Sequence, residues 1–280
     1  MTVNEIEKIF IDFKGLGGKS IKLLGEGEPL LRKDIFQILS KINDLKLTPV
    51  LFTCGDVIGN DKLANKLHGI SGKEIAKRLL DLNCTIMLKY EHPDAKQDLI
   101  VNRNGYSVLR NNALKILIDL KFNSYKITRL GFGIVLLKSN YVESRKIYEF
   151  AIRNNIYPLI CPIMPIGKMK IKKERLKLLP SKQEIIELKK DLKKIRDKEN
   201  IYVTSISDFP GGLPCDISRT GFYIDDIGNA FVCEADSFVY NIRDQDLHWI
   251  WNRINKLKWG KYKNMRKYGL CNPKRKFNIV

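Results

Sequence analysis

The chain has 280 residues, which is long enough to bury a large core, and we expect one or two globular domains. Its 50 lysines and arginines against 31 acidic residues give a formal charge of +19. Such a surface attracts anionic partners. Nucleic acid is compatible with this charge, but no recognised nucleic-acid-binding motif occurs in the sequence.

The sequence predicts no membrane association. No apolar run approaches the roughly 18 residues that a membrane-spanning helix needs. The segment Met1–Glu5 lacks the basic start and apolar core of a signal peptide. We therefore expect a cytoplasmic protein, and in that reducing compartment metal ligation or burial explains its six cysteines better than disulfides do.

The first 200 residues alternate amphipathic stretches with short apolar runs. Apolar residues recurring every three or four positions predict helices over 3–14, 31–45, 71–82, 112–122, 141–154 and 182–198. Apolar runs predict strands over 21–24, 49–52, 84–91, 130–137 and 156–163. This alternation is typical of a parallel sheet or barrel.

The pattern changes after residue 200, where we predict a domain boundary between 1–200 and 201–280. In the second part, two apolar runs between Phe222 and Cys233 flank a turn that contains Gly228 and Asn229. Runs of this kind joined by such a turn predict a β-hairpin.

The run over 21–24 ends in a glycine-rich acidic turn made of Gly25, Glu26, Gly27, Glu28 and Pro29. Glycines let the backbone approach a ligand closely, and proline favours the first turn of a helix. Glu28 supplies an acceptor for a cation. Barrels place their ligand-binding loops at such strand ends; without a ligand, the same residues would form an ordinary strand-to-helix turn.

The tetrapeptide Glu26-Gly27-Glu28-Pro29 resembles the Gly-Gly-Glu-Pro motif of radical S-adenosylmethionine (radical SAM) enzymes, with Glu26 in place of the first glycine. In that family the motif follows the second strand of a partial barrel and holds the amino group of the cofactor's methionine moiety. The resemblance implies an α/β fold, a partial TIM-like (β/α) barrel lacking its first strand, with S-adenosylmethionine as cofactor.

The resemblance also implies roles for residues at the later strand ends. Thr53 and Gly55 resemble the strand end that lies near the cofactor. Lys89 and Glu91 would contact its ribose or carboxylate, and Gly133 would border its adenine. Because strand-end charges are normally solvated, plain loop residues are the alternative interpretation of Lys89 and Glu91.

A second resemblance concerns the C-terminal cysteines. Cys215 is followed by twelve residues, Gly228, four residues and Cys233. This spacing resembles the first part of the auxiliary-cluster domain, called SPASM or twitch, that many radical SAM enzymes carry. With Cys271 as a third ligand it implies an auxiliary 4Fe-4S cluster, for which thiolates are the usual ligands. The short domain usually ends in Cys-x-x-Cys, but Lys274 stands at the last position, so the fourth ligand is unassigned. Zinc on the same thiolates is the alternative.

The Cys-x-x-x-Cys-x-x-Cys motif that binds the family's catalytic 4Fe-4S cluster does not occur in this sequence. By the resemblance these cysteines would precede Met1. We therefore expect a truncated radical SAM iron-sulfur protein, inactive alone, whose intact form reductively cleaves S-adenosylmethionine to modify a peptide or small-molecule substrate. The alternatives are a degenerate, non-catalytic radical SAM-like binding module and an unrelated barrel with a structural zinc site.

Overall fold

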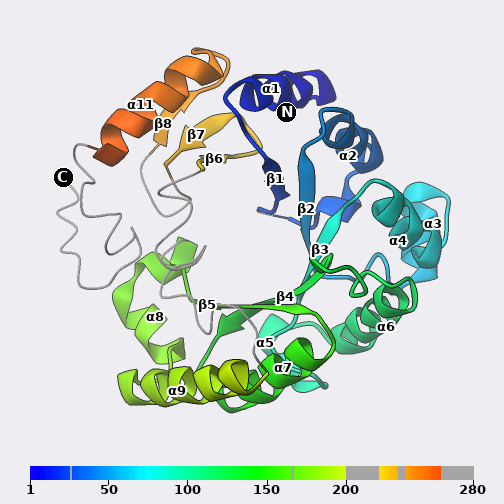
Figure 1. The fold of residues 1–280 in the computed structure, drawn as a ribbon, viewed down its shortest axis with the longest axis vertical. Coiled ribbons are helices and arrows are strands. Elements are labelled where there is room, and N and C mark those ends of the chain that lie inside the picture. Colours follow the sequence, from blue (N-terminus) through cyan, green and yellow to red (C-terminus); the bar gives the residue numbers. More distant parts are fainter. Residues whose placement is uncertain (26, 165–166, 200–220, 233–237, 260–280) are drawn as a thin grey trace.

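The computed structural model describes residues 1–25, 27–164, 167–199, 221–232 and 238–259. In these ranges five parallel strands curl through half a barrel, and three antiparallel strands form a separate small sheet (Figure 1). The predicted fold class is confirmed: the chain is an α/β partial TIM-like barrel followed by a small antiparallel sheet. The predicted boundary at residue 200 lies outside the described residues.

The parallel sheet has the order β1-β2-β3-β4-β5, so every strand lies beside its neighbours in the chain. The strands are β1 (Ser20–Leu23), β2 (Thr48–Thr53), β3 (Thr85–Lys89), β4 (Leu130–Leu136) and β5 (Tyr157–Pro162). All five predicted strands are present with small shifts of their bounds. Strands that alternate with helices in this way must run parallel, because each helix returns the chain to the start of the next strand.

The helices and 3-10 turns are α1 (Val3–Gly15), η1 (Pro29–Leu31), α2 (Ile35–Asp44), α3 (Asp61–His68), α4 (Gly72–Asp81), α5 (Lys96–Val101), α6 (Tyr106–Asp119), α7 (Tyr141–Arg153), η2 (Gly167–Lys170), α8 (Lys172–Leu178), α9 (Lys182–Lys198) and α11 (Leu247–Trp259). The prediction of a single helix over 31–45 is wrong in part. In the structure Leu31 ends η1 and α2 begins only at Ile35, because Arg32 adopts an extended conformation between them. The sequence did not predict α3, α5, α8 or α11.

Three helices begin with a capping box, in which a hydroxyl and a glutamate satisfy backbone N–H groups of the first turn. These pairs are Thr2 with Glu5 in α1, Ser71 with Glu74 in α4, and Ser181 with Glu184 in α9. Local side chains therefore fix where these helices start.

Successive side chains along each strand point alternately to a packed outer face and to an inner face of the sheet. On β3, Ile86 and Leu88 belong to the hydrophobic core beneath the helices, whereas Met87 and Lys89 point to the opposite side. Lys89 pairs in register with Gly133 on β4, so both belong to the inner face. Residues that leave the carboxyl ends of these strands are thus gathered at one end of the half-barrel.

The small sheet contains the predicted hairpin. Its strands are β6 (Tyr223–Ile224), β7 (Asn229–Phe231) and β8 (Phe238–Asn241), in that order. The turn between β6 and β7 is held by Asp225, whose Oδ1 accepts from the backbone N–H of Asn229 at 2.7 Å. Gly228 has a φ of 88°, a conformation that glycine adopts without strain.

The small sheet contacts both edges of the half-barrel. Phe222 packs edge-on against Phe13 of α1, with ring centroids 6.2 Å apart. Arg243 donates to the Glu5 carboxylate of α1 at 2.7 Å. Met164, just after β5, packs against the small sheet's own hydrophobic cluster. The small sheet and α11 therefore lie across the open side of the half-barrel, as Figure 1 shows.

Candidate functional site

The candidate site lies where the parallel strands end. Parallel barrels place binding and catalytic groups at the carboxyl ends of their strands. Here Glu28 follows β1, Thr53 ends β2, and Lys89 ends β3. The structure brings the first two into direct contact.

Glu28 is the best-anchored residue of this site. Its Oε1 accepts the Leu30 N–H at 3.1 Å and the Thr53 hydroxyl at 2.8 Å. Its Oε2 accepts the Cys54 N–H at 2.6 Å. A carboxylate has about four acceptor positions, so these three bonds fix the group and leave it able to accept a further donor.

The electrostatics of Glu28 favour a cationic ligand. Burial raises the pKa of the Glu28 carboxyl above its usual range, although hydrogen bonds from Cys54 and Thr53 oppose this shift. In the described part of the chain, no lysine or arginine forms an ion pair with it. A partly buried carboxylate without a paired cation is stabilised by any ammonium group that reaches it.

Hydrogen bonds and close packing within the protein fix the residues at the carboxyl end of β2. The Thr53 hydroxyl accepts the Gly55 N–H at 3.0 Å, and the Tyr106 hydroxyl donates to the Cys54 carbonyl at 2.8 Å. Gly55 has a φ of 82°, and a Cβ there would lie 2.6 Å from a Leu88 methyl carbon. Glycine at position 55 is therefore required by the fold, whether or not a ligand binds.

Lys89 and Glu91 lie together at the end of β3. The Lys89 Nζ is 3.4 Å from Glu91 Oε1, and Gln97 donates to Glu91 Oε2 at 2.6 Å. Glu91 is 1% exposed, so it is not a solvated strand-end charge. The lysine side chain is 40% exposed and can reach a ligand from its place beside the inner face.

Two residues that the sequence analysis missed hold Glu91 in place. Gln97 is fully buried and bridges Glu91 to Arg110, whose guanidinium donates to Gln97 Oε1 at 3.2 Å. Arg110 also donates to the His92 carbonyl at 2.8 Å. The sequence did contain a signal for it: Arg110 falls in the apolar stripe of α6 between Tyr106 and Ala113, where an arginine must find buried partners.

Two glycines on β4 have different surroundings. A Cβ on Gly131 would clash with the Met87 sulfur and approach the Tyr157 carbonyl oxygen at 3.0 Å. A Cβ on Gly133 would meet nothing nearer than 4.0 Å. Gly131 is therefore needed for packing, whereas a Cβ at Gly133 would make only ordinary van der Waals contacts on the inner face beside Lys89.

In the turn after β1, Gly25 has a φ of 153°, a conformation that suits glycine. A Cβ on Gly27 would meet no atom within 4 Å. Pro29 begins η1, as the sequence predicted for the start of a helical turn. Glu26 lies outside the described residues.

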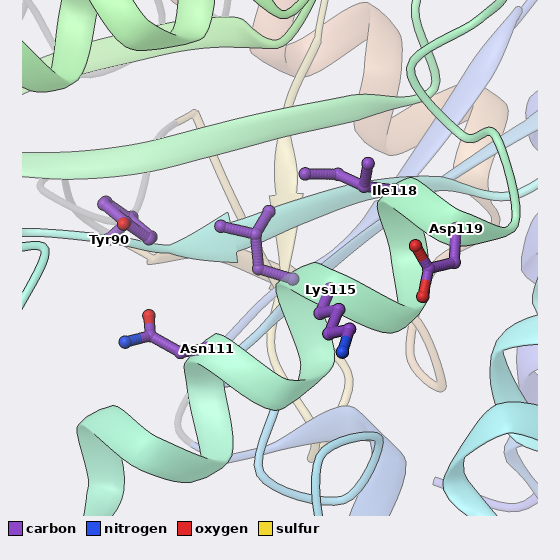
Figure 2. A pocket seen from close by; sticks show the side chains of 6 residues that line it. Tyr90, Asn111, Lys115, Ile118 and Asp119 are labelled. Carbon is purple, nitrogen blue, oxygen red and sulfur yellow. The ribbon is translucent and has the colours of Figure 1, made fainter.

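A shallow cavity of about 320 Å³ lies between Tyr90 and α6, on the helix-covered side of the sheet (Figure 2). Apart from Tyr90, its lining residues all belong to α6. The Tyr90 ring lies between the Arg110 guanidinium, 3.8 Å from its centroid, and the Phe132 ring, 4.2 Å away. Neither face of this tyrosine is open to a ligand, so the strand-end cluster is the better candidate site.

The predicted metal ligands Cys215, Cys233 and Cys271 all lie outside the described residues, so the auxiliary cluster stays a prediction. Within the residues that are described, no three metal-binding side chains cluster. Burial raises the pKa of the Cys54 thiol to about 11 and that of Cys84 to about 12. Both groups therefore stay protonated at neutral pH.

The chain is similar in fold to solved structures of SuiB from Streptococcus suis. The structure of SuiB bound to the precursor peptide SuiA matches with a TM-score of 0.66 at 15% identity, over 96% of this chain and 60% of that one. The structure bound to S-adenosylmethionine matches with a TM-score of 0.65 at 18% identity, over 90% and 58%.

At these identities the likeness shows the fold alone, which is a partial TIM-like barrel. The chain spans about 60% of the length of SuiB. No protein-family model matches the chain, and neither does any curated protein sequence. Among the helices that the structure describes, none has the length and hydropathy to cross a membrane.

Proposed function

We propose that this chain binds S-adenosylmethionine at the carboxyl ends of its parallel strands, as the cofactor-binding part of a radical SAM enzyme. The observation that carries the proposal is the Glu28 carboxylate, which is fixed by three hydrogen bonds and has no cation bound to it among the described residues. The ammonium of the cofactor's methionine moiety is the matching donor. The fold similarity to SuiB, solved with S-adenosylmethionine, supports this assignment.

The remaining strand ends suit the other parts of the cofactor. The Lys89 ammonium would bind the methionine carboxylate or a ribose hydroxyl, and the buried Glu91 would act indirectly by holding Lys89 in place. The inner face beside Gly133, which carries no side chain there, would accommodate the adenine. Thr53 would act indirectly, because its hydroxyl is already bound to Glu28 and Gly55.

We propose that the thiolates of the catalytic cluster come from sequence outside these 280 residues, so that this chain alone does not cleave the cofactor. Cys215, Cys233 and Cys271 would hold an auxiliary 4Fe-4S cluster, with zinc as the competing metal. When bound, such clusters supply electron-transfer chemistry. Thiolates of this kind remain available in the cytoplasm, where we place the protein.

We propose a peptide substrate for the intact enzyme, because a SuiB structure of similar fold was solved bound to its precursor peptide SuiA. The half-barrel leaves an inner face lined by Lys89 and Gly133 beside the cofactor position. A substrate segment on this face would lie next to the bound cofactor.

Isothermal titration calorimetry with S-adenosylmethionine tests the cofactor assignment. We expect saturable one-site binding that Glu28→Gln weakens and Glu74→Gln does not, because Glu74 is an exposed carboxylate whose hydrogen bonds cap α4 through Ser71. Absence of binding by the native chain would favour the unrelated barrel. Binding of the same strength in both variants would remove Glu28 from the site.

Metal analysis after anaerobic reconstitution with iron and sulfide tests the C-terminal cysteines separately. We expect one cluster that Cys233→Ala abolishes and that Cys84→Ala, which removes a buried thiol, leaves intact. One equivalent of zinc without iron would overturn the cluster assignment. Cofactor cleavage by this chain alone would contradict the proposed outside origin of the catalytic thiolates.

A further inference from the structure

The segment 167–178, which contains η2 and α8, carries a concentrated positive charge. It has six basic residues and one acidic residue, and that acid, Glu174, already binds Lys177 at 2.8 Å. Four of its lysines are exposed, and none of them forms an ion pair within the described ranges: Lys168, Lys170, Lys172 and Lys173. This charge is therefore available to an anionic partner.

The same segment exposes aliphatic side chains between its lysines. Ile171 is 58% exposed, Leu176 is 56% exposed and Leu178 is 45% exposed. Single exposed apolar residues are ordinary, but here three of them fall within eight positions. Basic and aliphatic groups thus share one short segment, which we call the α8 face.

The neighbouring helix α9 differs, although it too is rich in lysine. Its Asp191 lies 3.4 Å from Lys194 and 3.8 Å from Arg145, and its Arg196 binds Asp197 at 2.9 Å. Charges of both signs are therefore mixed along α9, which has seven basic and four acidic residues in 17 positions. The segment 167–178 has six basic residues and one acidic residue in twelve positions, so its positive charge is more concentrated.

The α8 face is held in place at the carboxyl end of the parallel sheet. The Leu178 carbonyl accepts the Lys138 backbone N–H at 2.7 Å, and Arg175 donates to the Met169 carbonyl at 2.6 Å. The segment follows β5, so it stands at the same end of the sheet as Glu28 and Lys89. Figure 1 shows α8 beside β5 on the open side of the half-barrel.

The composition of the α8 face favours a peptide over other anionic partners. Single-stranded nucleic acid is usually bound by aromatic side chains that stack on bases, and residues 167–178 contain no aromatic residue. Helices that lie in a membrane surface present a long apolar face, whereas α8 has only seven residues. Aliphatic groups among lysines complement leucine-like side chains among carboxylates.

We propose that the α8 face docks an acidic, aliphatic-containing segment of the peptide substrate and thereby directs the peptide toward the inner face of the half-barrel. This inference rests on the proposed function, since it specifies the substrate class of that same site. It also identifies a recognition surface separate from the cofactor-binding residues.

Fluorescence anisotropy with the full chain tests this proposal. The probe is a short fluorescein-labelled peptide of glutamate, aspartate and leucine, compared with a version in which serine replaces leucine. We expect Lys170→Glu/Lys173→Glu to weaken binding about tenfold, because two attractions become repulsions. Ile171→Ser/Leu176→Ser should weaken it by a similar factor of about ten, and the serine peptide should bind weakly to every variant.

The matched control is Lys190→Glu/Lys193→Glu on α9, which changes the net charge equally at two exposed lysines. We expect less than about a twofold effect from this pair at physiological salt, where distant charges are screened. An equal loss of peptide affinity in the control would show that only the overall charge matters, and it would overturn the proposal. Tighter binding of single-stranded RNA or phosphatidylserine vesicles, lost with Lys170→Glu/Lys173→Glu, would also overturn it.

Calorimetry with S-adenosylmethionine on the same variants separates the two proposals. We expect unchanged cofactor affinity in both double variants of the α8 face. Peptide binding without any cofactor binding would refute the proposed function and leave the docking surface standing. Cofactor binding with no peptide binding would refute the docking surface alone.

Discussion

Replacing Glu28 by glutamine provides a sharp test of the site, because the substitution keeps the shape of the side chain and removes its charge. The glutamine amide cannot accept a hydrogen bond through its nitrogen, so either the Cys54 N–H or the Leu30 N–H loses its partner. Thr53 can rotate its hydroxyl to accommodate the change. The variant therefore removes the negative charge with little rearrangement of the surrounding backbone.

The expected loss of affinity follows from the bond that is removed. A hydrogen bond between an ammonium and a carboxylate contributes about 1.5–3 kcal/mol. At 1.4 kcal/mol per factor of ten, Glu28→Gln should weaken S-adenosylmethionine binding by roughly 10- to 100-fold at neutral pH. Glu74→Gln, on the exposed start of α4, should leave the affinity unchanged.

The pH dependence of cofactor affinity and of stability tests the role of Glu28 independently. Burial raises the folded-state pKa of Glu28 above its unfolded value, so its contribution to stability is present below the unfolded pKa and is lost as pH rises through the folded pKa. An ammonium ligand binds the ionised form. Cofactor affinity should therefore increase as pH rises through the raised pKa of Glu28, and Glu28→Gln should abolish this increase.

Calorimetry at several pH values and chemical denaturation of both proteins measure these effects. Relative to the glutamine variant, the native chain should lose stability as pH rises through the window in which Glu28 ionises. A native affinity that is independent of pH, or a variant that keeps the pH dependence, would refute the role assigned to this carboxylate.

Two matched pairs of substitutions test the surroundings of the site. Gly131→Ala should cost about 1–3 kcal/mol of stability by overpacking. Gly133→Ala should fold normally but weaken S-adenosylmethionine binding, measured by calorimetry, at least about tenfold. Equal cofactor affinity in Gly133→Ala and the native chain would exclude the proposed adenine position. Tyr106→Phe should cost about 1 kcal/mol by losing its bond to the Cys54 carbonyl. Tyr148→Phe should cost nothing in urea denaturation, since the described residues offer its buried hydroxyl no partner, and a clear loss there would show an overlooked contact.

The sequence was most informative where local chemistry determines structure. Each parallel strand is an apolar run bounded by turn residues, and Ser71 caps α4 as its spacing to Glu74 indicates. The helices that were missed include α3, α5 and α8, which have eight, six and seven residues and too few turns to show a clear apolar period. Short helices of this kind depend on the packing that surrounds them.

The site could be predicted only in part, since strand ends are recognisable but their contacts are not. The resemblance drew attention to Glu28, yet its bonds to Thr53 and Cys54 connect the segment after β1 with the carboxyl end of β2, which is distant in the chain. Gln97 and Arg110 were missed because they act on Glu91 through buried contacts from other elements. The part of the prediction that concerns the C-terminal cysteines lies outside the described residues.

A crystal structure of the chain grown with S-adenosylmethionine tests the central claim most directly. The proposed function predicts cofactor density at the carboxyl ends of β1 to β4, with the methionine ammonium within hydrogen-bonding distance of Glu28 and the adenine beside Gly133. Cofactor bound elsewhere, or strand ends without cofactor density at saturating concentration, would contradict it.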